Sequence, residues 1–271
     1  MIQDYYKKWR TLSNSNQFKQ IAFKEFQLGE SCGIVVKNFL NQTCINTLLS
    51  NYELVKAEDK SGFNKLEGVV YPAPFSVLAH DNFNEKTIKS ILPKGKQMLE
   101  QLLLNVEMKG ENLVDYIFKF FNQGCKIKNI VKGELNGDLL QNESVHYLTI
   151  RELFSDQGGI NKHNEKELQL YYKRYFELLN IPVPHFQMSF FMMIQKPTIG
   201  GELEIHNQYF GTNHQHDPND LIHTPKIDVG DLVIFNGGDN YHSVHNGTGD
   251  VTRVTLGGFL SKQEDKFIMW S

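Results

Sequence analysis

Apolar side chains recur at helical spacing in three segments of the first half of the chain. These segments are residues 39–54, 91–106 and 112–121, and each has one apolar stripe and one polar face. Pro93 suits the first turn of the second helix, where its missing N–H is not needed. The stripes are typical of plain core packing. We therefore expect residues 1–140 to form a mainly helical support region without catalytic residues.

The pattern changes near residue 145, where short segments rich in β-branched and aromatic residues alternate with glycine-rich turns. Strands are expected at residues 146–154, 188–195, 202–210, 231–235 and 253–260. Short strands with such turns indicate an antiparallel barrel or sandwich. No linker separates the two halves, so we expect one α+β domain over residues 1–271, with the barrel core in 141–271.

Two local features refine this expectation. A helix is predicted at residues 165–179, because Asn180 and two following prolines would end it. Pro197 and the pair Gly200-Gly201 lie between the strands 188–195 and 202–210. This turn chemistry predicts that the two strands form a hairpin.

Composition and charge exclude several classes of protein. Hydrophobic residues make up 40% of the chain and charged residues 22%, which excludes global disorder. The net charge of −3 argues against a nucleic-acid partner held by a general positive field. The three cysteines form no Cys-x-x-Cys pair and fit a reducing compartment. No apolar run resembles a signal peptide or a membrane span, so we expect a cytoplasmic protein without membrane contact.

Histidine is the unusual residue, since eight of the ten histidines lie after residue 160. His163-Asn164-Glu165 places an imidazole and a carboxylate close enough to share a metal, and His242 could supply a third ligand from another strand. Two histidines and one carboxylate on one face leave three octahedral positions open, which is typical of non-haem Fe(II) oxygenases. Arg253, eleven residues after His242, could then hold the far carboxylate of a 2-oxo acid through two parallel hydrogen bonds.

The order and spacing of these motifs resemble the second half of a 2-oxoglutarate oxygenase barrel. The resemblance rests on residues 230–236 (Gly-Asp-Leu-Val-Ile-Phe-Asn), 241–245 (Tyr-His-Ser-Val-His) and 252–255 (Thr-Arg-Val-Thr), and it covers about residues 149–260. It implies a double-stranded β-helix, the jelly-roll or cupin-like barrel, behind a helical N-terminal layer.

A narrower resemblance is to the small free-amino-acid halogenases and hydroxylases, which include the carrier-independent lysine halogenase. It rests on residues 187–194, 200–203 and 255–260, and on an aromatic residue near the C-terminus, here Trp270. In the halogenases a small residue, usually glycine, replaces the carboxylate ligand and frees a site for halide. This chain has Glu165 there, which favours hydroxylation over halogenation.

The resemblance implies a mechanism and a set of roles. His163, Glu165 and His242 would hold Fe(II), while Arg253, with the Thr255 hydroxyl, would bind the far carboxylate of the cosubstrate 2-oxoglutarate. The enzyme would use O2 to hydroxylate an unactivated C–H bond and release succinate and CO2. The implied substrate is a free amino acid or a similar small polar metabolite.

Several residues compete for these roles or have simpler interpretations. Strand alternation puts His242 and His245 out of phase, and the spacing to Arg253 favours His242 as the ligand. The cluster at residues 214–217 (His-Gln-His-Asp) lies in a polar segment and is expected to be a solvated loop. His206 is expected to be a hydrogen-bonded structural histidine. For Arg151 a salt bridge is favoured and a substrate contact is the alternative.

Other interpretations stay open at this point. Trp270 fits a substrate wall about as well as simple packing, and His163 and Glu165 could merely cap the following helix. A protein or peptidyl hydroxylase of the same superfamily would need an open groove. A cupin-like barrel that binds a metal without turnover belongs to a different functional class.

Overall fold

A computed structural model describes eleven stretches of the chain. They are residues 9–20, 31–58, 63–65, 68–72, 85–125, 130–132, 147–154, 159–166, 186–209, 222–263 and 266–271. The helices are η3 (Ser15–Gln20), α2 (Gln42–Glu58), α4 (Glu85–Leu102) and α5 (Leu113–Cys125). The strands are β1 (Trp9–Leu12), β2 (Gly33–Val36), β3 (Phe63–Lys65), β4 (Gly68–Tyr71), β5 (Glu107–Met108), β6 (Glu111–Asn112), β7 (Ile130–Lys132), β8 (Thr149–Leu153), β9 (Ile160–His163), β10 (Phe186–Gln195), β11 (Leu203–Tyr209), β12 (Ile222–His223), β13 (Leu232–Phe235), β14 (Asn240–Val244), β15 (Arg253–Gln263) and β16 (Lys266–Trp270).

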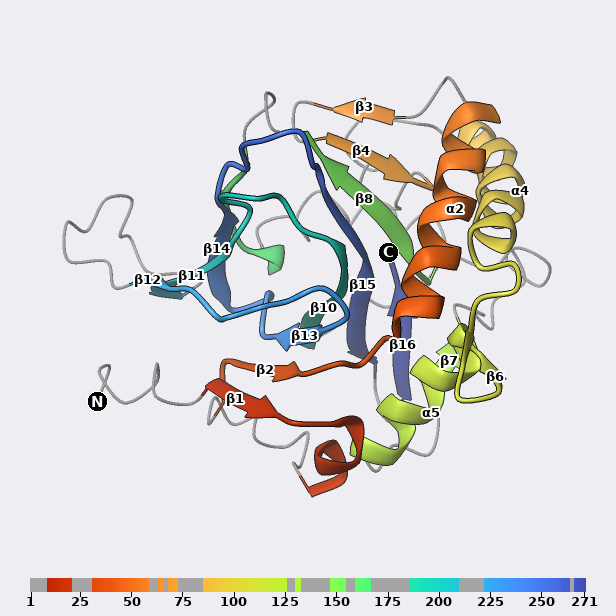
Figure 1. The fold of residues 1–271 in the computed structure, drawn as a ribbon. Helices are drawn as coiled ribbons and strands as arrows, with labels where there is room; N and C mark the ends of the chain where they lie inside the picture. Colours follow the sequence, from red (N-terminus) through yellow and green to blue (C-terminus); the bar gives the residue numbers. More distant parts are fainter. Residues whose placement is uncertain are drawn as a thin grey trace.

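Two sheets form the barrel. The larger runs in the order β1-β2-β13-β10-β15-β8-β4-β3, with β16 paired to β15 and to β7. The smaller runs in the order β12-β11-β14-β9. Figure 1 shows the smaller sheet facing the larger one across the barrel. This is the double-stranded β-helix that the sequence predicted.

The larger sheet is buried on both faces, and its central strand β10 illustrates why. Phe190, Met192 and Ile194 belong to the core cluster between the sheet and the helices. Phe191 and Met193, which alternate with them, pack in the cluster between the two sheets. A strand covered on both sides reads as a nearly continuous apolar run, as residues 188–194 do.

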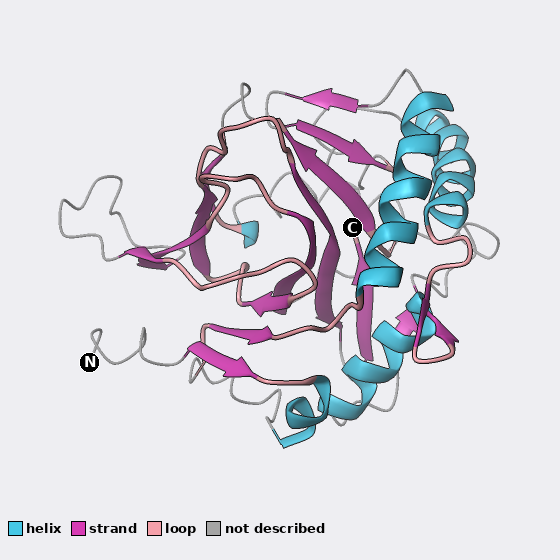
Figure 2. Cartoon of the chain, in the orientation of Figure 1, coloured by secondary structure: helices cyan, strands magenta, loops and turns pink. Residues whose placement is uncertain are grey.

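The helices form a layer on the outer face of the larger sheet, and Figure 2 shows α2 and α4 side by side there. Helix α2 begins where the Asn41 side chain accepts a hydrogen bond from the Cys44 N–H at 2.8 Å, a usual N-cap contact. Phe121 of α5 packs edge-on against Phe190 of β10, with ring centroids 5.1 Å apart. The helical layer therefore supports the strand at the centre of the sheet.

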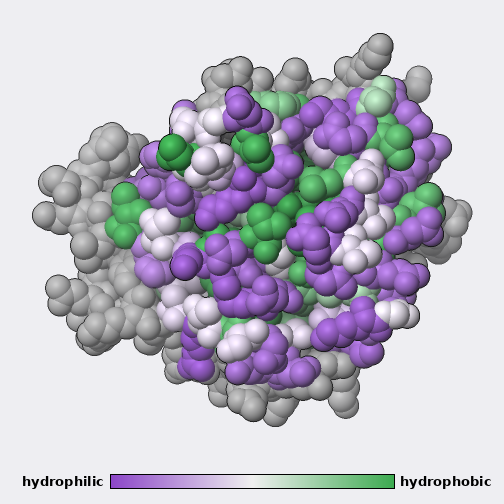
Figure 3. Space-filling model, in the orientation of Figure 1, coloured by the Kyte–Doolittle hydropathy of each residue, from purple (hydrophilic) through white to green (hydrophobic). Residues whose placement is uncertain are grey.

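One face of the protein shows how polar and apolar residues are distributed on the surface. On the face in Figure 3 hydrophilic residues dominate, and hydrophobic residues lie in small groups between them. Among the described residues, no helix is both long enough and apolar enough to cross a bilayer.

Three sequence-based expectations need correction. The N-terminal region is less helical than expected, because β1 to β4 join the larger sheet. Strands β10 and β11 do not form a hairpin, since β10 pairs with β13 and β15 while β11 pairs with β12 and β14. The Pro197–Gly201 connection instead crosses from one sheet to the other, which closes the barrel.

Pro93 lies inside α4 rather than in its first turn, and the buried residues Met98, Leu99 and Leu102 follow it.

Candidate metal centre

Two histidines lie close together at the edge of the smaller sheet. His163 is the last residue of β9 and pairs in register with His242 of β14. Paired antiparallel residues share one face of a sheet, and the two imidazole centroids are 4.3 Å apart. Strand pairing therefore brings together two residues that are 79 positions apart in the sequence.

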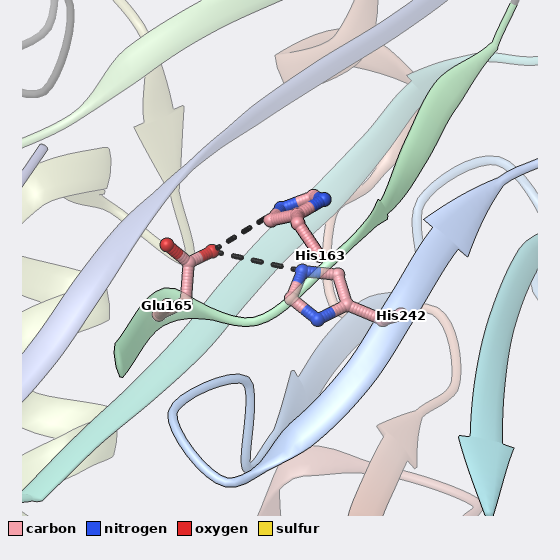
Figure 4. A group of neighbouring side chains, drawn as sticks. All are labelled: His163, Glu165 and His242. Carbon is pink, nitrogen blue, oxygen red and sulfur yellow. Dashed lines mark ion pairs between the residues drawn. The ribbon is translucent and has the colours of Figure 1, made fainter. Parts of the chain in front are cut away.

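Glu165 completes the group from the helical residues 165–166 that follow β9 (Figure 4). Its backbone N–H donates to the Gly237 carbonyl at 2.9 Å, which anchors this segment to the residues before β14. Its Oε1 lies 3.9 Å from His163 Nε2 and 3.6 Å from His242 Nε2. One ligand atom from each residue lies within 4.8 Å of the others, so a single ion could contact all three.

Backbone carbonyls orient both imidazoles. His163 Nδ1 lies 2.7 Å from the Asn161 carbonyl, and His242 Nδ1 lies 3.1 Å from the Asn240 carbonyl. A carbonyl only accepts, so each Nδ1 carries a proton, while each Nε2 lies on the side of Glu165. Metal-binding histidines usually show this arrangement.

The pKa shifts of His163 and Glu165 also fit a metal-binding role. Burial, and then the neighbouring His242, lower the pKa of His163 to about 4, so this imidazole is neutral at physiological pH. Burial alone would raise the pKa of Glu165, but its hydrogen bond with His242 and the nearby His163 hold that pKa below its usual value. The site therefore offers two imidazole nitrogens and one carboxylate.

One further observation fits a cation. Glu165 is 4% exposed, and its Oε2 is buried without a hydrogen-bond partner. Leaving a charged oxygen desolvated and unpaired is costly, and a bound cation would remove that cost. Two imidazoles and one carboxylate on one side of an ion suit Fe(II) with open positions.

Ser189 is a neighbour of this group that the sequence analysis missed. It lies on β10, and its hydroxyl donates to Glu165 Oε1 at 3.5 Å. A Cβ added at Gly237 would lie 2.2 Å from Ser189 Oγ and 3.3 Å from Glu165 Cγ. The absence of a side chain at Gly237 thus leaves room for the Ser189–Glu165 contact. The signal in the sequence was a single serine inside an apolar strand.

Arg253 lies on the opposite sheet. It is 4% exposed, its Nε donates to the Gly201 carbonyl at 3.0 Å, and its guanidinium lies 5.0 Å from the Phe191 ring centroid. Burial, together with the charge of Arg151, lowers its pKa to about 9, so it stays charged at neutral pH. No described carboxylate pairs with it. Thr255, two residues further along β15, is buried and shares its face.

The other histidines considered in the sequence analysis are not part of the metal group where the structure describes them. The side chain of His245 is 60% exposed, and it is not part of the His163–Glu165–His242 group. His206 is buried and hydrogen-bonded to Ser243 Oγ at 2.9 Å, as expected of a structural histidine. The 214–217 cluster and most of the helix predicted at 165–179 lie outside the described residues.

Trp270 and Arg151 were the two substrate candidates. Trp270 is 3% exposed, donates from Nε1 to Ser261 Oγ at 2.8 Å and packs on Phe259 at 4.8 Å. The salt bridge favoured for Arg151 is not formed with any described carboxylate. Arg151 lies on β8 in register with Thr255.

Comparisons with known proteins identify a family and agree with the fold. The family model described as carrier-protein-independent halogenase WelO5 matches residues 29–271. A crystal structure of an N-substituted L-amino acid dioxygenase from Burkholderia ambifaria AMMD, in complex with alpha-KG, is similar with a TM-score of 0.55 and 14% identity. The similarity covers 95% of this chain and 91% of that one. A second structure of that dioxygenase gives a TM-score of 0.55 at 13% identity, over 96% and 92% of the two chains. No curated protein sequence gives a significant match.

Proposed function

The chain belongs to the carrier-protein-independent halogenase WelO5 family, and from this premise we propose that it is an Fe(II)- and 2-oxoglutarate-dependent hydroxylase. Its substrate would be a free amino acid or a similar small polar metabolite, hydroxylated at an unactivated C–H bond. The observation that carries hydroxylation rather than halogenation is Glu165. This buried carboxylate lies beside both imidazoles, at the position that the halogenases leave open for halide.

The roles of the residues follow from the site. His163, Glu165 and His242 would hold Fe(II), and the buried Arg253 would bind the far carboxylate of 2-oxoglutarate, with Thr255 beside it. The chemistry supplied by bound iron is activation of O2, coupled to decarboxylation of 2-oxoglutarate to succinate and CO2. The B. ambifaria dioxygenase crystallised with alpha-KG supports this choice of cosubstrate.

The protein contributes orientation and the exclusion of water. The backbone carbonyls of Asn161 and Asn240 accept from the two Nδ1 atoms and so orient the imidazoles, with each Nε2 on the side of Glu165. The ring of Phe235 packs edge-on against His242, with centroids 4.9 Å apart, and covers that imidazole. Phe191 covers the Arg253 guanidinium. A dry, oriented site makes each charged contact stronger than it would be in water.

An absorption measurement tests the core of the proposal. Anaerobic addition of Fe(II) and 2-oxoglutarate should produce a visible iron-to-2-oxoglutarate charge-transfer band. No band at saturating Fe(II) would contradict the proposal. A structural cupin-like barrel that binds metal but lacks a 2-oxoglutarate site would also give no band.

A second experiment addresses the reaction. A panel of free amino acids, assayed by succinate release and product mass, should give one oxygen added per turnover. The product should not depend on chloride, whereas a chlorinated product from the wild type would favour halogenation. Turnover only with peptides, rising with their length, would favour a peptidyl hydroxylase.

A further inference from the structure

Arg151 faces the barrel interior from β8. Its two neighbours, Ile150 and Glu152, face the helical layer: Ile150 belongs to the core under the helices, and Glu152 accepts hydrogen bonds from Tyr52 and Lys56 of α2. Successive strand residues point to opposite faces. Arg151 therefore points to the same side of the sheet as Thr255, its register partner on β15.

This position lies on the strand next to the one that carries Arg253. Along β15, Thr255 is two residues from Arg253, and Arg151 is one strand away from Thr255. The charge of Arg151 also helps to lower the pKa of Arg253 on the neighbouring strand. The interior thus holds two guanidiniums on neighbouring strands.

Neither guanidinium has a partner of opposite charge in the part of the chain that the structure describes. Arg253 is fixed by Gly201 and Phe191, and it is almost fully buried. Arg151 is only half-buried, and no described residue holds its guanidinium through a hydrogen bond or a ring contact. The deeper arginine suits the cosubstrate, while the half-buried Arg151 stays accessible to a substrate.

The charges of the interior residues indicate which kind of substrate group could pair with an arginine there. Arg151, Arg253 and Glu165 together carry one net positive charge. Fe(II) and the dianion of 2-oxoglutarate cancel, so they leave the Arg151 guanidinium without a counter-charge. In a poorly solvated interior an unpaired charge is unfavourable, and a carboxylate on the substrate could pair with it directly.

We infer that Arg151 binds the carboxylate of the substrate, so that the enzyme recognises molecules carrying a carboxylate and rejects their neutral amides. The inference rests on the proposed function, because it assumes that 2-oxoglutarate occupies Arg253. The planar guanidinium can make two parallel hydrogen bonds to a carboxylate. A carboxamide offers one acceptor and an NH2 group, so it lacks both the charge and the second acceptor.

The test compares Arg151→Gln with the wild type and with Lys226→Gln, which removes an exposed positive charge outside the barrel. The probes are the free L-amino acids and their primary amides. Each is titrated calorimetrically into protein that holds Fe(II) and 2-oxoglutarate without oxygen. Binding of 2-oxoglutarate itself is measured separately through the charge-transfer band. No readout depends on turnover.

The expected result has three parts. At least one amino acid binds the wild type and the Lys226→Gln variant about tenfold or more tightly than its amide, which corresponds to about 1.4 kcal/mol. In Arg151→Gln that preference falls to about twofold or less, and 2-oxoglutarate binds within about threefold of wild type. Arg151→Lys, which keeps the charge but not the fork, retains part of the preference.

Four outcomes would overturn the inference. Arg151→Gln could lose 2-oxoglutarate affinity about tenfold, which would assign Arg151 to the cosubstrate. It could keep the full preference for the acid over the amide. Amides could bind the wild type as well as the acids do, or no free amino acid could bind at all. Absence of the charge-transfer band in the wild type would instead refute the proposed function, so the two failures are distinguishable.

Discussion

His163 and His242 face each other across one antiparallel strand pair, and their rings are 4.3 Å apart. Pairing of β9 with β14 therefore positions two of the three candidate ligands before any ion is bound. Glu165, two residues beyond His163, can reach the same point because its segment is hydrogen-bonded to Gly237. The predictions below test this site and the elements that hold it.

Replacing His242 by alanine should abolish the Fe(II)–2-oxoglutarate band, because the ion loses one of its two nitrogen ligands. The matched control is His245→Ala, three residues along the chain. The side chain of His245 is 60% exposed and outside the metal group, so its removal should leave the band unchanged. Loss of the band in His245→Ala but not in His242→Ala would show that the ligand choice is wrong.

Replacing Arg253 by glutamine should weaken 2-oxoglutarate binding by about 10- to 100-fold, since hydrogen bonds to charged groups contribute about 1.5–3 kcal/mol. Titration of the band with 2-oxoglutarate measures this change. Direct Fe(II) binding, followed calorimetrically, should stay near the wild-type value. A parallel loss of iron affinity would mean that Arg253 supports the barrel rather than the cosubstrate.

A double-mutant cycle can test the contact between Ser189 and Glu165. Ser189→Ala removes the hydroxyl that donates to Glu165 and should weaken Fe(II) binding by about threefold to tenfold, less than a shorter hydrogen bond would. Gly237→Ala places a methyl group 2.2 Å from Ser189 Oγ. When Ser189 is present, this change should displace the Ser189 side chain and weaken Fe(II) binding more than Ser189→Ala does.

The same clash should be milder when Ser189 is already alanine, because the nearest remaining atom is then its Cβ at 3.1 Å. The two changes should thus be non-additive in iron affinity, with an interaction energy of about 0.5–3 kcal/mol. Strictly additive effects would show that Gly237 does not act through Ser189.

Glu152→Gln should destabilise the fold by about 2–3 kcal/mol in denaturant unfolding. Glu152 accepts hydrogen bonds from Tyr52 at 2.6 Å, Lys56 at 2.7 Å and Thr252 at 2.8 Å, which join α2, β8 and the segment before Arg253. The control is Glu53→Gln, an exposed carboxylate on α2, for which a change within about 0.5 kcal/mol is expected. Equal effects at both positions would contradict a specific role for Glu152.

The metal-free protein should lose stability as the pH falls from about 6.5 toward 4. In the unfolded chain His163 takes up a proton near 6.5, whereas burial lowers the pKa of the folded residue to about 4. Within this window the unfolded state binds more protons, so acid favours unfolding. His163→Asn should flatten this part of the unfolding free energy against pH, and an unchanged slope would contradict the assignment.

The chemistry of the site could be predicted from the sequence because ligand type, order and spacing are local features. His163-x-Glu165 and the segment from His242 to Arg253 each lie on one short stretch of chain. The central strands were predicted for a similar reason, since apolar runs bounded by glycine have a recognisable pattern.

Contacts between distant segments could not be predicted in this way. Strand β2 is only four residues long, and it is a strand because it pairs with β13, nearly 200 residues later. The hairpin prediction failed because turn residues specify a reversal, but not which sheet the chain enters next. The partners of Glu152 and the contact of Ser189 with Glu165 likewise depend on tertiary packing.

The place of β9 in the smaller sheet has one more consequence. This strand has four residues, lies at the edge of its sheet and pairs only with β14 among the described strands. An ion bound by both His163 and His242 would hold the edge strand β9 against β14. Iron would then stabilise the sheet as well as take part in the reaction. Its release should let β9 exchange its amide hydrogens before the rest of the barrel does.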